Sequence, residues 1–85
     1  MAETALERAL RAAADSFRLG MDAQANQALV PAVDLLARHL SGLPAARAAA
    51  LAATFPRLVA AQGRGDTLAV ADSIEFELLP LLGAG

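Results

Sequence analysis

Apolar side chains recur at three- and four-residue intervals along most of the chain, which is the spacing of one face of an α-helix. The pattern predicts a first helix over residues 2–19, ended by Gly20, whose apolar face consists of Leu6, Leu10, Ala13, Ala14 and Phe17. A second helix is predicted from Asp22, as N-cap, to Leu40, with an apolar face of Ala25, Leu29, Val33, Leu36 and Leu40. This face continues across Pro31, so we expect the helix to be kinked there rather than split in two.

Two further helices are predicted in the second half of the chain. The third covers residues 44–62, and because Pro56 lies inside its pattern we expect a kink or a break there. Its apolar face consists of Ala48, Leu51, Phe55, Leu58 and Val59. Gly63 to Gly65 form a turn, after which Asp66 caps a fourth helix that begins at Thr67 and ends near residue 79 or 82. The main stripe of this helix consists of Val70, Ile74, Leu78 and Leu81.

The fourth helix carries more large apolar side chains than one face requires. The residues outside its main stripe are Leu68, Phe76, Leu79 and Leu82. We therefore predict an all-α fold, an antiparallel bundle of three to four helices with proline-kinked helices. It forms a single domain over residues 1–85, and homodimerisation completes it by covering the surplus apolar surface.

The composition agrees with helices and limits the chemistry. Of the 85 residues 56% are hydrophobic, but 23 of these 48 are alanine, a strong helix former that buries little area. A core this small favours help from a second subunit. The chain has no cysteine, which excludes disulfides and thiolate catalysis and, with no recognisable export signal, favours the cytoplasm.

Charge and hydropathy exclude two classes of partner. The formal net charge is −2, and the chain has neither a cluster of basic residues nor an aromatic platform, so we predict no binding to nucleic acid. The longest uncharged apolar run, residues 48–56, is about half of the roughly 20 residues that a membrane-spanning helix needs. We therefore predict no membrane span.

The histidine and one tripeptide have both a functional and a structural interpretation. His39 is the only histidine, and no nucleophile accompanies it in a known signature, so we interpret it as a partly exposed structural residue and predict no metal site. Arg64, Gly65 and Asp66 form an Arg-Gly-Asp sequence, which is an integrin-binding motif in some extracellular proteins. Here a glycine turn followed by a capping aspartate explains all three residues.

Acidic residues are densest on the fourth helix. Asp72 and Glu75 are predicted to face one side of it and Glu77 the other. We interpret them as rim residues that form salt bridges with arginines of neighbouring helices, with recognition of a partner as the alternative.

The end of the chain has a distinctive sequence. It resembles a family of small bacterial all-α proteins of unknown function, in which the last helix reads approximately A-D-x-[IL]-E-[FY]-E-[LI]-x-P-[LI]-L. The matching residues are Ala71, Asp72, Ile74, Glu75, Phe76, Glu77, Leu78, Pro80, Leu81 and Leu82. The turn at residues 19–22 and the helix interrupted by Pro31 are also similar. The resemblance implies an all-α fold, members that are not known enzymes, and a link to motility and surface-assembly loci.

These observations predict a non-enzymatic protein-interaction module, an adaptor or chaperone-like protein that serves flagellar or surface assembly. Its expected partners are a second copy of the chain and a protein that the sequence does not identify, and no cofactor or catalytic residue is predicted. The predicted interaction residues are Leu68, Asp72, Glu75, Phe76, Leu79 and Leu82. The alternative is a small-ligand-binding or regulatory domain with an apolar pocket between its kinked helices.

Overall fold

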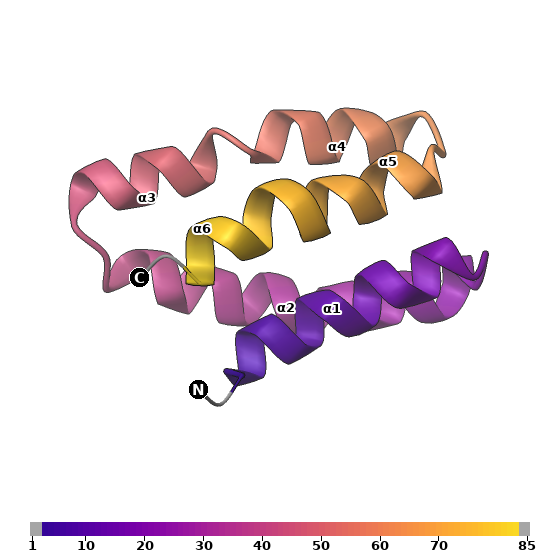
Figure 1. Cartoon of the computed structure of the whole chain (residues 1–85), viewed down its shortest axis with the longest axis horizontal. Coiled ribbons are helices and arrows are strands. Elements are labelled where there is room, and N and C mark those ends of the chain that lie inside the picture. The colour runs from indigo at the N-terminus through magenta and orange to yellow at the C-terminus, as the bar shows by residue number, and fades with distance from the viewer. Residues whose placement is uncertain (1–2, 84–85) are drawn as a thin grey trace.

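The computed structural model describes residues 3–83, and all regular secondary structure within them is helical (Figure 1). Its elements are α1 (Ala5–Arg18), α2 (Asp22–Ser41), α3 (Ala45–Ala52), α4 (Phe55–Gly63), α5 (Thr67–Asp72), the π-helical turn η1 (Ser73–Leu78) and α6 (Leu79–Gly83). Since α5, η1 and α6 follow one another without a break, they form one helical rod. The predicted all-α bundle is confirmed.

Local hydrogen bonds determine both ends of α1. The Oγ1 atom of Thr4 accepts a hydrogen bond from the backbone N–H of Glu7 at 3.1 Å, which caps the helix, and donates one to the Glu7 carboxylate at 3.0 Å. The predicted start at residue 2 lies outside the described residues, and this cap places the observed start at Ala5. At the other end, Gly20 has a φ of 73°, a left-handed conformation that glycine adopts without strain, and it ends the helix as predicted.

The helix α2 continues through Pro31, so the prediction that it is not split is confirmed. Asp22 is its first residue rather than its N-cap. The buried positions of α2 are Ala25, Leu29, Ala32 and Leu36. Val33, predicted on the apolar face, is exposed. The buried residues of α2 follow one another at steps of four, three and four residues, so Ala32 faces the core and its neighbour Val33 does not.

The predicted third helix is broken near Pro56 into α3 and α4. Pro56 lies in the first turn of α4, where its missing N–H has no intrahelical acceptor to lose. The sequence predicts a kink or a break at this point, and the structure has the break. Only Leu51 of α3 and Ala61 of α4 are buried, whereas Val59, predicted on the apolar face, is exposed. The predicted face is therefore wrong at Val59, whereas Phe55 and Leu58 of the same face are partly buried against the core.

The rod contains an unusual turn at η1. The N–H of Leu79 donates to the carbonyl oxygen of Ile74, five residues earlier, instead of four as in an α-helix. Pro80 provides the physical reason, because its ring would clash with the carbonyl group of Phe76, four residues before it. The turn widens to hold one more residue, and the side chains beyond it are rotated relative to a regular helix.

This rotation exchanges the positions of two leucines. Leu79, predicted on the uncovered face, is only 7% exposed, whereas Leu81, predicted in the buried stripe, is 37% exposed. The prediction that Leu79 contributes to an interaction surface is therefore wrong. Val70, Ile74 and Leu78, which precede the altered register, are buried as predicted.

The helices run alternately in opposite directions, with the rod at the centre of the bundle (Figure 1). The helix α1 packs against α2 on one side and against α5 and η1 on the other, and α4 packs against α5. The core lies where α1, α2 and the rod meet, and its largest fully buried side chains are Leu10, Val70, Ile74 and Leu78. Burial of these side chains is the main source of stability in a domain of this size.

Candidate interaction surface

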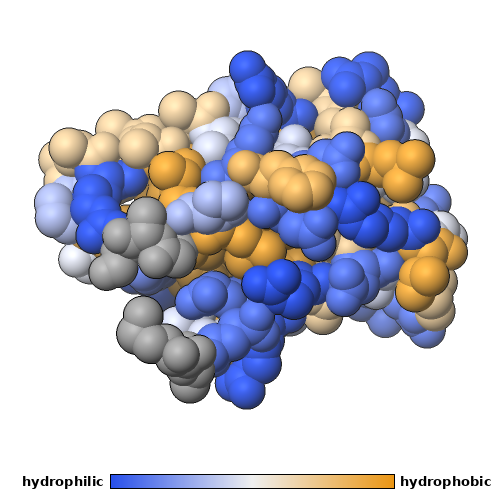
Figure 2. All heavy atoms as spheres, in the orientation of Figure 1, coloured by the Kyte–Doolittle hydropathy of each residue, from blue (hydrophilic) through white to orange (hydrophobic). Residues whose placement is uncertain are grey.

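The structure brings four of the six predicted interaction residues together on the outer side of the rod. Leu68, Asp72 and Phe76 follow one another at four-residue intervals along α5 and η1, and Glu75 lies beside Phe76. We call these four residues the Phe76 surface. Leu68 is 58% exposed and Phe76 is 68% exposed. Figure 2 shows that apolar groups on this face of the molecule form small patches separated by hydrophilic side chains.

The other two predicted residues lie elsewhere. Leu79 belongs to the core. Leu82 is partly buried near the end of the rod, where it lines a depression together with Leu6 and Leu35. The change of register at η1 thus separates Leu79 and Leu82 from the other four predicted interaction residues.

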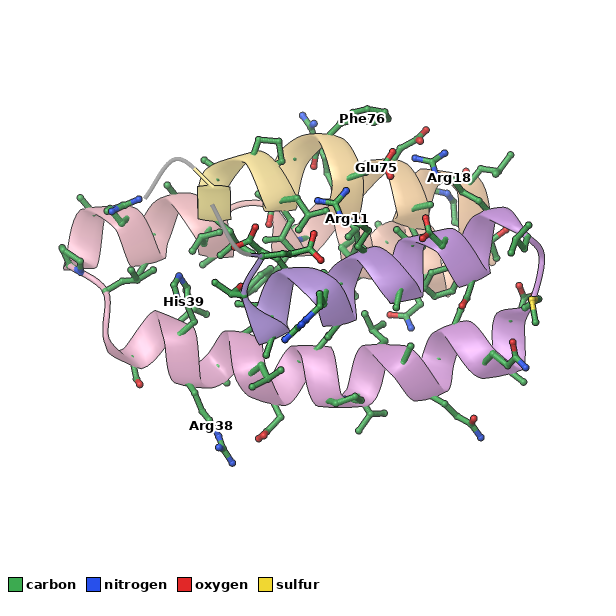
Figure 3. All side chains as sticks on the ribbon, turned by 60° about the horizontal axis from the view of Figure 1, so that its bottom comes forward. Arg11, Arg18, Arg38, His39, Glu75 and Phe76 are labelled. Atoms are coloured by element: carbon green, nitrogen blue, oxygen red, sulfur yellow. The ribbon has the colours of Figure 1, made fainter. Side chains whose placement is uncertain are left out.

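Arg18, at the end of α1, forms ion pairs with the two acidic residues of the Phe76 surface. Its Nη2 atom lies 3.0 Å from Oδ1 of Asp72 and 2.9 Å from Oε2 of Glu75. Its guanidinium carbon lies 5.8 Å from the centroid of the Phe76 ring, within the range of a cation–π contact. Figure 3 shows Arg18, Glu75 and Phe76 gathered at the same edge of the bundle.

A groove lies on the other side of Phe76. Arg57 of α4 donates to Oε1 of Glu77 at 2.8 Å and so ties α4 to η1 across the groove. The groove has a volume of about 420 Å³, opens widely to solvent, and is lined by Ala53, Thr54, Arg57, Phe76, Glu77, Pro80 and Leu81. It exists because the chain is broken between α3 and α4 beside the widened turn of the rod.

The ion pairs confirm the interpretation of the acidic residues as rim positions. Asp72 and Glu75 pair with an arginine on one side of the rod, and Glu77 pairs with an arginine on the other. Sequence reasoning did not identify which arginines take part, because Arg18 and Glu75 are separated by 57 residues. No local spacing rule connects positions so far apart.

Other charged groups have local roles. Asp66 accepts a hydrogen bond from the N–H of Ala69 at 3.1 Å, which confirms it as the cap of α5, and Gly65 has a φ of 70° in the preceding turn. The pKa of the Arg11 guanidinium is raised by its hydrogen bond to Glu3 and by the charge of that carboxylate. This group therefore stays protonated and offers no acid–base chemistry near neutral pH.

Neither a group of metal ligands nor a membrane-spanning helix is found in the described part of the chain. Within residues 3–83, no group of three or more His, Cys, Asp or Glu side chains is placed to hold a metal ion. Across that same range, no helix combines the length and the hydropathy needed to cross a membrane.

Comparison with known proteins yields no relative: no protein-family model, curated protein or solved structure matches the chain.

Proposed function

We propose that the chain is a non-enzymatic protein-interaction module, an adaptor or chaperone-like protein of the cytoplasm, that contacts its partner through the Phe76 surface. The observation that supports this is the exposure of Phe76, of which 68% faces solvent although it stands on a helix fixed in the core. An accessible aromatic side chain at the centre of a ring of charged groups is typical of protein–protein hot spots.

Charge pairing permits a second copy of the chain as one occupant of this surface. Asp72 and Glu75 would repel the same residues of a second copy if they were unpaired, but Arg18 of the same chain lies within 3.0 Å of both, so that two carboxylates and one guanidinium leave a charge of −1. Two Phe76 surfaces therefore approach around a twofold axis against weaker repulsion than unpaired carboxylates would cause, and burial of the two rings favours the contact. We propose that the free chain forms a homodimer in which the two Phe76 rings are buried, and that the partner protein displaces the second copy from the same surface.

Light scattering at several protein concentrations tests the homodimer. We expect the wild-type chain to dimerise and Phe76→Asp to be monomeric, while both keep the same helix content by circular dichroism. Val30→Asp is the matched control, since Val30 is similarly exposed but lies on α2, and it should still dimerise. A monomeric wild-type chain, or loss of the dimer in both variants, would show that the proposed dimer is wrong.

Site-specific photo-crosslinking tests the adaptor function. A photo-reactive phenylalanine analogue at position 76 should yield a defined adduct with a partner protein in host cells, whereas the same analogue at position 30 should not. The family resemblance makes flagellar and surface-assembly proteins the first candidates to examine. Identical adducts from both positions, or adducts from neither, would contradict the proposal.

A further inference from the structure

A second depression lies between the end of α2, the link that follows it, and α3. It has a volume of about 250 Å³, and Leu43, Leu51, Leu81 and two alanines of α3 form its apolar lining. His39 and Arg47 are its only polar lining residues. Figure 3 shows His39 pointing from α2 toward the α3 side, whereas the neighbouring Arg38 points away from the bundle. We call this depression the His39 cleft.

The composition of α3 explains why the cleft is open. This helix has the sequence AARAAALA and buries only Leu51. Alanine side chains are too short to fill the space between α3 and the rest of the bundle. The widened turn at η1 also directs Leu81 to the edge of the cleft instead of into the core. The result is an apolar surface that reaches solvent.

The basic side chains at the mouth of the cleft have no acidic partner within residues 3–83. Five of the seven arginines have a carboxylate oxygen within 4 Å, namely Arg11, Arg18, Arg38, Arg57 and Arg64. Among residues 3–83, neither Arg47 nor His39 has such a partner. An anion at this position would therefore gain a charge-assisted hydrogen bond without displacing an existing ion pair.

We propose that the His39 cleft binds an anionic amphiphile, a carboxylate with a single medium-length alkyl chain. The alkyl chain lies against Leu43, Leu51 and Leu81, and the carboxylate bonds to Arg47 and His39. The planar guanidinium of arginine matches the two oxygens of a carboxylate. Burial of the alkyl chain supplies most of the affinity, at about 0.8 kcal/mol for each buried CH₂ group.

The size of the cleft suits a single alkyl chain. A volume of about 250 Å³ holds a slender chain of several CH₂ groups, whereas a peptide helix, which is about 10–12 Å wide with its side chains, would only lie across the mouth of the cleft. His39 also borders a second depression, of about 380 Å³, whose lining includes Leu6, Leu35 and Leu82. A longer alkyl chain that passed His39 would also meet Thr4, Glu7 and Arg38 of that depression, so the His39 cleft itself favours a chain of medium length.

Titration of the full-length chain with decanoate, below its micelle-forming concentration, tests the proposal. We expect saturable binding by calorimetry, with amide NMR shifts concentrated at His39 and in residues 43–51. Decanol has the same alkyl chain without the charge and should bind roughly fivefold more weakly, as expected for loss of one exposed ion pair. Decyltrimethylammonium should bind more weakly still.

Equal affinity for all three ligands would overturn the assignment of a carboxylate head group. Absence of binding, or NMR shifts centred elsewhere, would overturn the site.

Variants separate the head group from the alkyl chain. Arg47→Gln should weaken decanoate binding roughly fivefold and leave decanol unchanged. Arg8→Gln is the matched control, because Arg8 also lacks a carboxylate partner within residues 3–83 but lies on α1. Ala50→Phe should fill the cleft and abolish binding of both ligands while the helix content is kept.

Two outcomes of the variant series would contradict the proposed site. One is an equal loss of decanoate binding in Arg8→Gln and Arg47→Gln, and the other is unchanged binding in a folded Ala50→Phe variant. Phe76→Asp should not affect decanoate binding, so this site and the Phe76 surface are tested independently.

Discussion

The helices α1 and α3 are both rich in alanine and arginine, yet only α1 is firmly built into the bundle. Five of the fourteen residues of α1 are buried, among them Leu6, Leu10 and Phe17, whereas only Leu51 is buried among the eight residues of α3. Alanine favours helix formation equally in both segments. The comparison shows that alanine builds a helix, while the large inward-facing side chains hold it in place.

This difference separates the surroundings of the two proposed sites. The Phe76 surface stands on the rod that α1 supports through Arg18, so its aromatic side chain is presented in a fixed position. The His39 cleft borders α3, where short side chains leave apolar surface accessible. A rigid surface suits recognition of a folded protein, and a loosely covered cleft suits a flexible chain.

Truncation of the core leucines gives the largest expected effect. Leu10→Ala should lower the free energy of unfolding by about 2–5 kcal/mol, because Leu10 is fully buried between helices that cannot close the cavity. Leu51→Ala should cost about 2 kcal/mol, since α3 can move inward to fill the space. Urea denaturation followed by circular dichroism measures both. If Leu51→Ala costs as much as Leu10→Ala, the contrast between the two helices is wrong.

Hydrogen exchange measures the same contrast without substitution. Amides in the middle of α3 should exchange roughly tenfold or more faster than those in the middle of α1, because opening of α3 exposes only one buried side chain. Mass spectrometry of peptic fragments or NMR resolves the two segments. Equal protection factors would mean that α3 opens only when the whole bundle unfolds.

Removal of the Arg18 contacts should have a smaller effect. Arg18→Gln loses two ion pairs and the contact with the Phe76 ring, for which we expect a loss of about 1 kcal/mol. High salt should reduce the difference from wild type, since it screens exposed charges. Arg64→Gln is the control, because the separation between Arg64 and Asp66 is 3.8 Å, and it should change stability by less than half as much. Equal losses of stability in the two variants would show that Arg18 contributes no more to the fold than Arg64 does.

A pair of glycine substitutions gives effects of about 1 kcal/mol or less and of opposite sign. Gly63 is the last residue of α4, and a Cβ atom there would meet open space, so Gly63→Ala should raise the free energy of unfolding by about 0.5 kcal/mol. Gly65 has a φ of 70°, so Gly65→Ala should lower it by about 1 kcal/mol. Thermal denaturation resolves the opposite signs. Stabilisation by both substitutions would mean that the turn before α5 tolerates another conformation.

Much of the fold could be predicted from the sequence, because apolar periodicity and capping residues are local signals. The burial of α1, the turn at Gly20, the break near Pro56 and the Asp66 cap all follow from neighbours within a few residues. The errors at Val33 and Val59 concern residues beside the true inward row. A regular pattern alone does not define which of two adjacent positions faces the core.

The surfaces were harder to predict because they depend on contacts between distant segments. The acidic residues of the last helix could be placed at its rim, but their partners Arg18 and Arg57 come from other helices. Leu79 and Leu81 were assigned to the wrong sides because a constant helical period does not include the wider turn that Pro80 imposes. Pro80 is the local signal for this turn, but Pro31 lies inside α2 without widening it, so a proline alone does not specify the wider turn.

The outward rotation of Leu81 has a consequence for how the two surfaces relate. This side chain lines both the groove beside Phe76 and the His39 cleft. The edges of two separate hollows therefore meet at one side chain that a regular helical period would have turned inward.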